Sequence, residues 1–232
     1  MGKNMKVNNE KYKLLIILIF TDLVFILIHM INVHTDLLNS SLYLLSRDRG
    51  FAEFFQYAKE LWIAILFLML AIKQKSGIFY VFSLLFIYFL IDDSLEVHEN
   101  FGRLLSEIFQ FQSLLGIRGV DIGELLVSGV FGLLFVTAIV LFFLLSDEIT
   151  RRIAHYLFVL LGLLVIFGVL MDMLEVMAPT PTLSGILLVI EEGGEMIVMS
   201  VITWFVFRLK APFDQLPMNW LPIKSSKNRV KS

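Results

Sequence analysis

Six long apolar runs alternate with short polar segments along the chain. A helix needs about 20 apolar residues to cross a bilayer, and the runs come close to or exceed that length. They lack the strict alternation of a half-buried strand, so they predict helices. We therefore expect an all-α polytopic membrane protein, a bundle of about six transmembrane helices. The predicted helices are Tyr12–Ile31, Phe54–Ile72, Gly77–His98, Ile122–Leu145, Ala154–Met177 and Leu183–Phe207.

Two of the predicted connections are more than simple loops. The segments near 36–53 and 101–120 both mix apolar and polar residues, and in the second the apolar residues recur near helical spacing. Such a pattern is typical of amphipathic helices that lie in the membrane interface. We expect residues 1–210 to form the transmembrane bundle with these two outer segments, and residues 211–232 to form a short basic cytoplasmic tail.

The composition supports a membrane protein and excludes several kinds of site. Of 232 residues, 58% are hydrophobic and 22 are Phe, and the mean hydropathy is +0.82, which is too apolar for a soluble domain of this size. The chain has no cysteine, so disulfides, thiolate metal sites and cysteine nucleophiles are excluded.

The basic residues predict the orientation of the bundle. With the N-terminus in the cytoplasm, only five of the 19 Lys and Arg residues fall on the outer side. Basic residues concentrate on the cytoplasmic side of membrane proteins, so both termini are expected there, in a multi-pass protein of the plasma membrane. The short basic clusters are membrane flanks and give no support for nucleic-acid binding. The five outer residues are Arg47, Arg49, Lys59, Arg103 and Arg118.

Three carboxylates interrupt the last apolar run. Glu191, Glu192 and Glu195 lie within Leu183–Phe207, and the apolar pieces on either side of them are too short to span. A charged side chain at the centre of a bilayer costs roughly 2.5–3.5 kcal/mol, and such residues are functional by default. These acids therefore need protons, a metal or partner residues.

Further acids on other predicted helices fall at the same depth, in the outer half of the membrane. Many are spaced three or four residues apart and so share a helix face. We expect no Lys or Arg deep enough to neutralise this layer, because Lys59 is predicted at a helix end. The sequence identifies no partner for Asp22. The candidate metal ligands are Asp92, Asp93, Glu96, His98, Glu99, Asp172, Glu175, Glu191, Glu192 and Glu195.

Carboxylates with an imidazole suit hard or borderline divalent metal ions. Zn, Mn and Fe fit such a set, and Ca fits if the imidazole stays out. Protons shared between neighbouring carboxyl groups would satisfy the same layer. The sequence leaves both options open, and it assigns no catalytic residue.

Two short motifs resemble those of an uncharacterised family of small prokaryotic multi-pass membrane proteins. The first reads Asp92-Asp93-Ser94-Leu95-Glu96-Val97-His98-Glu99, in which Glu96 is an extra acid relative to the family pattern Asp-[Asp/Glu]-x4-His-Glu. The second reads Glu191-Glu192-Gly193-Gly194-Glu195-Met196 and follows the pattern Glu-Glu-x2-Glu-Met. The resemblance implies that the two clusters act together, and it implies no particular reaction.

Three classes of function agree with these features. The first is a carboxylate and histidine metal site open to the outer surface, in a metal-dependent enzyme acting on a lipid-like substrate. The second is a divalent-cation or proton-coupled transporter. The third is a sensor or assembly subunit without catalysis. Membrane lipids are the expected partners, while partner proteins and the oligomeric state stay open.

Overall fold

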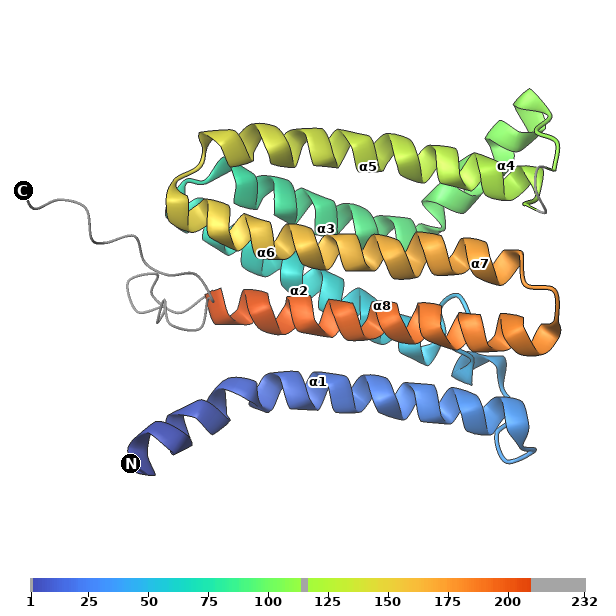
Figure 1. The fold of residues 1–232 in the computed structure, drawn as a ribbon, viewed down its shortest axis with the longest axis horizontal. Helices are drawn as coiled ribbons and strands as arrows, with labels where there is room; N and C mark the ends of the chain where they lie inside the picture. The colour runs from blue at the N-terminus through green and yellow to red at the C-terminus, as the bar shows by residue number, and fades with distance from the viewer. Residues whose placement is uncertain (1, 114–116, 210–232) are drawn as a thin grey trace, which may run out of the picture.

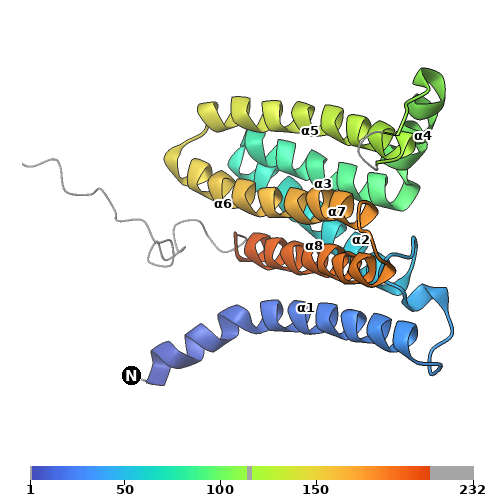
Figure 2. The same ribbon diagram turned by 45° about the vertical axis from the view of Figure 1, so that its right-hand side comes forward.

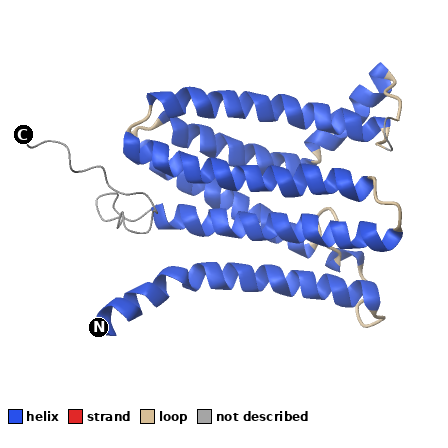
Figure 3. Ribbon diagram, viewed as in Figure 1, coloured by secondary structure: helices blue, strands red, loops and turns tan. Residues whose placement is uncertain are grey.

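The computed structural model describes residues 2–113 and 117–209, and the side chains of residues 12–113 and 117–209. Every regular element within these ranges is helical, as Figure 3 shows, which confirms the all-α prediction. Six long rods lie side by side (Figure 1). They are α1 (Gly2–His34), α2 (Phe51–Gln74), α3 (Gly77–Leu95), α5 (Gly119–Leu145), the continuous rod of α6 (Glu148–Val165), η2 (Ile166–Met171) and α7 (Asp172–Val176), and α8 (Pro181–Leu209).

Five of these rods are long and apolar enough to cross a membrane. They are Tyr12–His34 within α1, all of α2, α3 and α5, and Glu148–Val176. The sixth rod, α8, has a comparable length but carries the three glutamates in its middle. Leu, Ile and Phe side chains are exposed along the rods, as expected of helices that contact lipid. The chain is therefore a multi-pass membrane protein.

The two ends of the bundle differ in charge. At one end lie the start of α1, the α2–α3 turn, the α5–α6 turn and the end of α8, and we call it the basic end (Figure 1). At the opposite end, the acidic end, lie the α1–α2 connection, α4 (Val97–Phe109) and the α7–α8 connection. The basic end carries the described residues Lys73, Lys75, Arg151, Arg152 and Arg208.

The apolar core fills the half of the bundle nearest the basic end. Phe67 on α2 is fully buried, and its ring stacks on those of Phe79, Phe82 and Phe86 along α3. Buried residues of α6 and of the second half of α8 close this core. Helices α2 and α8 run through both halves of the bundle. Their apolar residues pack in this core, and they also carry polar side chains in the half nearest the acidic end.

The helix predicted over Gly77–His98 ends three residues earlier, at Leu95. Glu96 adopts a left-handed conformation with φ 53°, which stops α3 and turns the chain into α4. The Asn100 side chain donates to the carbonyls of Leu95 and Glu96 and so satisfies the open helix end. The expectation that Asp92, Glu96 and Glu99 share one continuous helix face is therefore wrong.

Both predicted outer segments contain helical structure. The first holds a short 3₁₀ turn, η1 (Ser41–Tyr43), and is tied to α1 where the Leu45 N–H donates to Nδ1 of His29 at 3.1 Å. The second contains α4, whose Phe101, Ile108 and Phe109 are exposed. Its position in the membrane interface stays a prediction. Residues 114–116 of that segment and the predicted tail 211–232 lie outside the described residues.

Glycines allow close helix packing at the acidic end. A Cβ on Gly193 would touch Ile26 of α1, and one on Gly194 would collide with the ring of Phe167 in η2. The pair Gly193-Gly194 thus brings the α8 backbone close to helices on two sides, next to the acids Glu192 and Glu195. In Figure 2, α8 lies between α1 and the α6–α7 rod, in agreement with these contacts.

Candidate functional site

Lys59 lies inside the bundle. It follows the first residue of α2 by eight positions, which is roughly 12 Å along the helix axis. Its side chain is 0% exposed. The prediction that Lys59 marks a helix end on the outer side is wrong, because α2 begins three residues earlier than expected, at Phe51.

The Lys59 ammonium is held by groups from three helices. Its Nζ donates to Asp22 Oδ1 of α1 at 3.1 Å, to the Met196 carbonyl of α8 at 2.9 Å and to Ser200 Oγ at 3.4 Å. Ser200 donates in turn to Asp22 Oδ2 at 2.5 Å, and the ring of Phe55 lies 4.8 Å from Nζ. We call Asp22, Lys59 and Ser200 the Lys59 cluster.

The Lys59 cluster supplies the partner that the sequence did not identify for Asp22. Asp22 lies near the middle of the apolar stretch Tyr12–His34 and is 0% exposed. Both of its carboxylate oxygens are hydrogen-bonded, so the hydrogen-bonding capacity of the buried Asp22 side chain is satisfied by Lys59 and Ser200. Removing one partner of such a buried pair leaves an uncompensated charge, which costs about 3–5 kcal/mol. The cluster therefore holds α1 against α2 and α8.

The next residue on α2, Glu60, has the opposite character. It is also 0% exposed, but neither carboxylate oxygen has a hydrogen-bond donor among the described residues. Asp93 of α3 lies within hydrogen-bonding reach of Glu60, and Glu195 of α8 is a further negative neighbour. We call Glu60, Asp93 and Glu195 the carboxyl cluster. Lys59 is the positive group within electrostatic range of Glu60.

Glu195 rests against an irregular stretch of helix. Residues Ile166–Met171 form the π-helical segment η2, which inserts one wider turn between α6 and α7. A Cβ on Gly168 in this segment would collide with Oε1 of Glu195, so the carboxyl group occupies the space that a side chain would fill. Single π-helical turns occur frequently at functional sites. The sequence pattern predicts an uninterrupted helix over Ala154–Met177 and gives no sign of this segment.

Asp92 and His98 are occupied with each other. Asp92 Oδ1 accepts the His98 backbone N–H at 2.8 Å, and Oδ2 lies 3.1 Å from His98 Nδ1. Burial lowers the pKa of the His98 imidazole, but the Asp92 carboxylate and the nearby Glu99 and Asp93 outweigh it and raise the pKa to about 9. Asp92 and His98 therefore form an ion pair that fixes the start of α4.

Other predicted site residues are dispersed. Glu96 forms an ion pair with Arg49 at 3.1 Å, and Glu175 accepts from the Ser184 hydroxyl. On α4, burial and then the charge of Asp48 raise the pKa of Glu99.

The remaining acids are neighbours of one another. Asp172 and Glu175 lie within electrostatic range of Glu191, while Glu195 and Glu191 are the nearest negative groups to Glu192. These acids therefore form an extension of the carboxyl cluster on α7 and α8.

No group of three or more His, Asp or Glu side chains lies close enough to hold a metal ion within the part of the chain that the structure describes. The ten predicted ligands thus do not converge on one centre in this arrangement. Asp93 and Glu195 lie within electrostatic range of each other, whereas Asp92, Glu96 and His98 have partners of their own. The divalent metal stays a prediction.

The predicted set of metal ligands leaves out four residues at the centre of the site. Ser200 carried no signal, since a hydroxyl in an apolar helix is common. Asp22 and the adjacent pair Lys59 and Glu60 did carry one, because charged residues inside apolar runs need partners. Matching the isolated basic residue to the isolated acidic residue would have suggested the ion pair.

Comparison with known proteins places the chain in a family without assigning it an activity. No curated protein and no solved structure matches it significantly. A family profile matches residues 16–211, which include most of α1, the other five rods and the residues of both clusters. The chain therefore belongs to the family described as a domain of unknown function, DUF8692.

Proposed function

We propose that this protein is a cation-coupled membrane transporter in which the carboxyl cluster binds and releases the cation, and that the cation is a proton. The observation that carries the proposal is Glu60, a fully buried carboxyl group with no hydrogen-bond donor among the described residues, within hydrogen-bonding reach of a second, partly buried acid, Asp93. Two carboxyl groups within hydrogen-bonding reach of each other cannot both be charged without a cation, and one shared proton satisfies both. Intramembrane acids of this kind mark ion pathways and proton relays.

The acids of α8 supply an approach to this cluster from the acidic end. Glu192 and Glu191 are electrostatic neighbours of Glu195, which in turn neighbours Asp93 and Glu60. Such a series of carboxyl groups lets a proton move in short steps from the surface to the buried pair. By the distribution of basic residues, the acidic end faces the outside and the basic end the cytoplasm.

The Lys59 cluster gives the pathway a continuation toward the middle of the membrane. Lys59 and Glu60 are adjacent, and the ammonium group that donates to Asp22 also lies within electrostatic range of Glu60. When Glu60 loses its proton, it becomes a second anion that competes with Asp22 for Lys59. Loosening the Asp22 contact releases α1 from α2 and α8, which is the movement that alternating access requires.

Reconstitution into liposomes tests this function. We would impose a pH difference across the membrane and follow internal pH with an entrapped dye, in parallel with uptake of Mn²⁺ and Zn²⁺ by an entrapped fluorescent chelator. The wild-type protein is expected to move protons, and Glu60→Gln, which cannot exchange a proton, is expected to abolish the flux.

Glu107→Gln is the matched control, because Glu107 is an exposed acid on α4 outside the cluster. It is expected to leave the flux unchanged. Absence of flux of protons and of both metals in the wild type contradicts the transporter, as does full activity of Glu60→Gln.

A metal-dependent enzyme is the second candidate. The observation in its favour is the run of acids Glu191, Glu192 and Glu195, for which the described residues provide no ion pair with Lys or Arg. A divalent Zn, Mn, Fe or Ca ion bound there would neutralise them and activate water. Elemental analysis of the purified protein tests it. A Glu192→Ala, Glu195→Ala double variant that retains as much metal as the wild type contradicts this candidate.

A further inference from the structure

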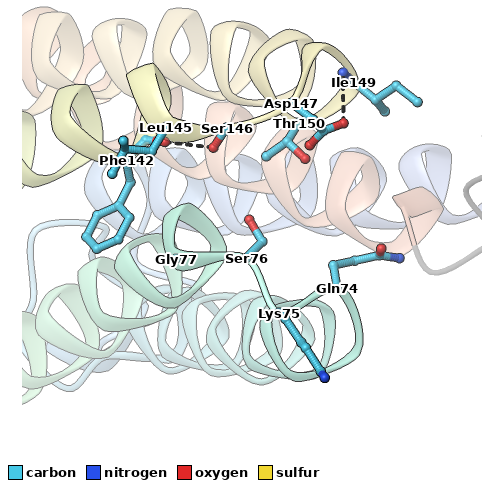
Figure 4. A pocket seen from close by; sticks show the side chains of 10 residues that line it. All are labelled: Gln74, Lys75, Ser76, Gly77, Phe142, Leu145, Ser146, Asp147, Ile149 and Thr150. Atoms are coloured by element: carbon cyan, nitrogen blue, oxygen red, sulfur yellow. Dashed lines mark hydrogen bonds between the residues drawn. The ribbon is translucent and has the colours of Figure 1, made fainter.

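A cavity of about 390 Å³ lies at the basic end, at the opposite end of the bundle from the acids of α7 and α8. It is formed by the α2–α3 turn, with Gln74, Lys75 and Ser76, and by the α5–α6 turn, with Ser146 and Asp147 (Figure 4). Its volume falls within the range of small-molecule sites. Since these two turns connect four spanning rods, the cavity lies at the level where the apolar core of a membrane gives way to lipid headgroups.

One side of the cavity is apolar. Phe142, Leu145 and Ile149 line it, and the Phe142 ring packs against Gly77, where a Cβ would collide with it. Leu145 is 81% exposed at the end of α5, so this side continues into the surface that faces lipid. A ligand with a polar head and an apolar tail fits a cavity with this division.

The other side carries polar groups that have no full set of partners. Thr150 is buried, at 6% exposure, and its hydroxyl has no hydrogen-bond partner among the described residues. Ser76 precedes the first turn of α3 but its side chain does not cap the helix, so the hydroxyl and the first N–H groups of α3 are available. In Figure 4 the Ser76 hydroxyl points toward the α5–α6 turn.

The charges at the cavity are of both signs. Asp147 caps α6 with one oxygen, which accepts from the Ile149 N–H at 3.3 Å, and its carboxyl group lines the cavity. Lys75 lies on the opposite turn, directly before the uncapped start of α3, a position that favours an anion. An acceptor-rich site on one turn thus faces a site suited to an anion on the other.

We propose that this cavity binds the headgroup of a membrane phospholipid that carries a primary ammonium group. The ammonium group donates to Asp147 and Thr150, and the phosphate lies against Ser76 and the first turn of α3. The acyl chains leave over Phe142 and Leu145 into the bilayer. A trimethylammonium group has no N–H to donate, and an anionic headgroup would meet Asp147, so both fit less well.

Native mass spectrometry of the full chain tests the proposal. The protein would be purified from nanodiscs containing equal parts of phosphatidylethanolamine, phosphatidylcholine and phosphatidylglycerol. We expect phosphatidylethanolamine to be retained at least about tenfold over the other two, the ratio given by a difference of about 1.4 kcal/mol. Asp147→Asn and Thr150→Val should each abolish this preference.

Both variants preserve the contacts that hold the α5–α6 turn. Asparagine caps a helix as well as aspartate does, and Thr150→Val removes a hydroxyl that has no partner. Glu148→Gln is the control, because Glu148 neighbours Asp147 but lies outside the cavity and pairs with Arg152. Equal retention of the three lipids by the wild type overturns the proposal. So does an unchanged preference in Asp147→Asn, or the same loss in Glu148→Gln.

Discussion

Lys59 and Glu60 are consecutive residues of one helix, both fully buried, and they lead into two contrasting regions. In the Lys59 cluster every charged group has a partner, and contacts from α1, α2 and α8 meet there. In the carboxyl cluster acids meet acids, and Glu60 has no donor among the described residues. Satisfied buried charges hold helices together, whereas unsatisfied ones need a cation from outside. Burial alone therefore does not distinguish a structural charged residue from a functional one. The number of hydrogen-bonding and ion-pair partners does.

The largest expected effect is on stability, from Lys59→Met. This change leaves Asp22 buried without its counter-ion and should lower the unfolding free energy by about 3–5 kcal/mol. Thermal unfolding in detergent micelles measures it. Lys75→Met, at an exposed position, is the control and should change little. Adding Asp22→Asn to Lys59→Met should restore part of the loss, and no recovery would show that the two residues are not a pair.

Gly168→Ala should have the next largest effect. The new methyl group meets Glu195 Oε1, so either the π-helical segment or the carboxyl group must move. Overpacking of this kind costs typically about 1–3 kcal/mol, and proton flux should fall with it. Gly162→Ala on the same rod is the control, because nothing lies within 4 Å of its Cβ position. Equal behaviour of the two variants would disprove a role for the Gly168 contact.

Glu60→Gln should affect cation flux strongly and stability little, whereas Lys59→Met mainly lowers stability. Because Glu60 has no donor to lose, the unfolding free energy should drop by no more than about 1 kcal/mol, while cation flux disappears. Thermal unfolding and liposome flux, measured on one preparation, separate the two effects. A large loss of stability with unchanged flux would place Glu60 among the structural residues.

The smallest effect concerns pH and the Asp92–His98 pair. The folded pKa of His98, about 9, exceeds its ordinary value of 6.5. The protonated form is therefore favoured by folding, so the stabilisation is complete below pH 6.5 and is lost as the pH rises through 9. Since the His98 side chain is 32% exposed, the effect should stay below about 1 kcal/mol.

Hydrogen exchange of the α4 amides measures this change. The wild type should lose protection between pH 6.5 and 9, after correction for the intrinsic exchange rate. His98→Gln should show no such change. The same pH dependence in both proteins would assign it to another group.

The candidate site was predicted in outline but not in its connections. The unusual placement of Glu191, Glu192 and Glu195 was evident from length alone, since an apolar run of that kind has no water to solvate an acid. Which acids meet could not be predicted, because spacing along one helix says nothing about the rotation of its neighbours. Asp92 and Asp93 are adjacent, yet one pairs with His98 and the other faces Glu60.

The sequence by itself determined the helices, the membrane and the presence of buried acids, because hydrophobicity and helical rise are local properties. Only the tertiary structure decided which charges are neutralised. The contact of Glu195 with Gly168 in the π-helical turn and the meeting of Asp22 with Lys59 both join segments far apart in the chain. A charge in a membrane is stable or reactive according to its neighbours, and packing selects those neighbours.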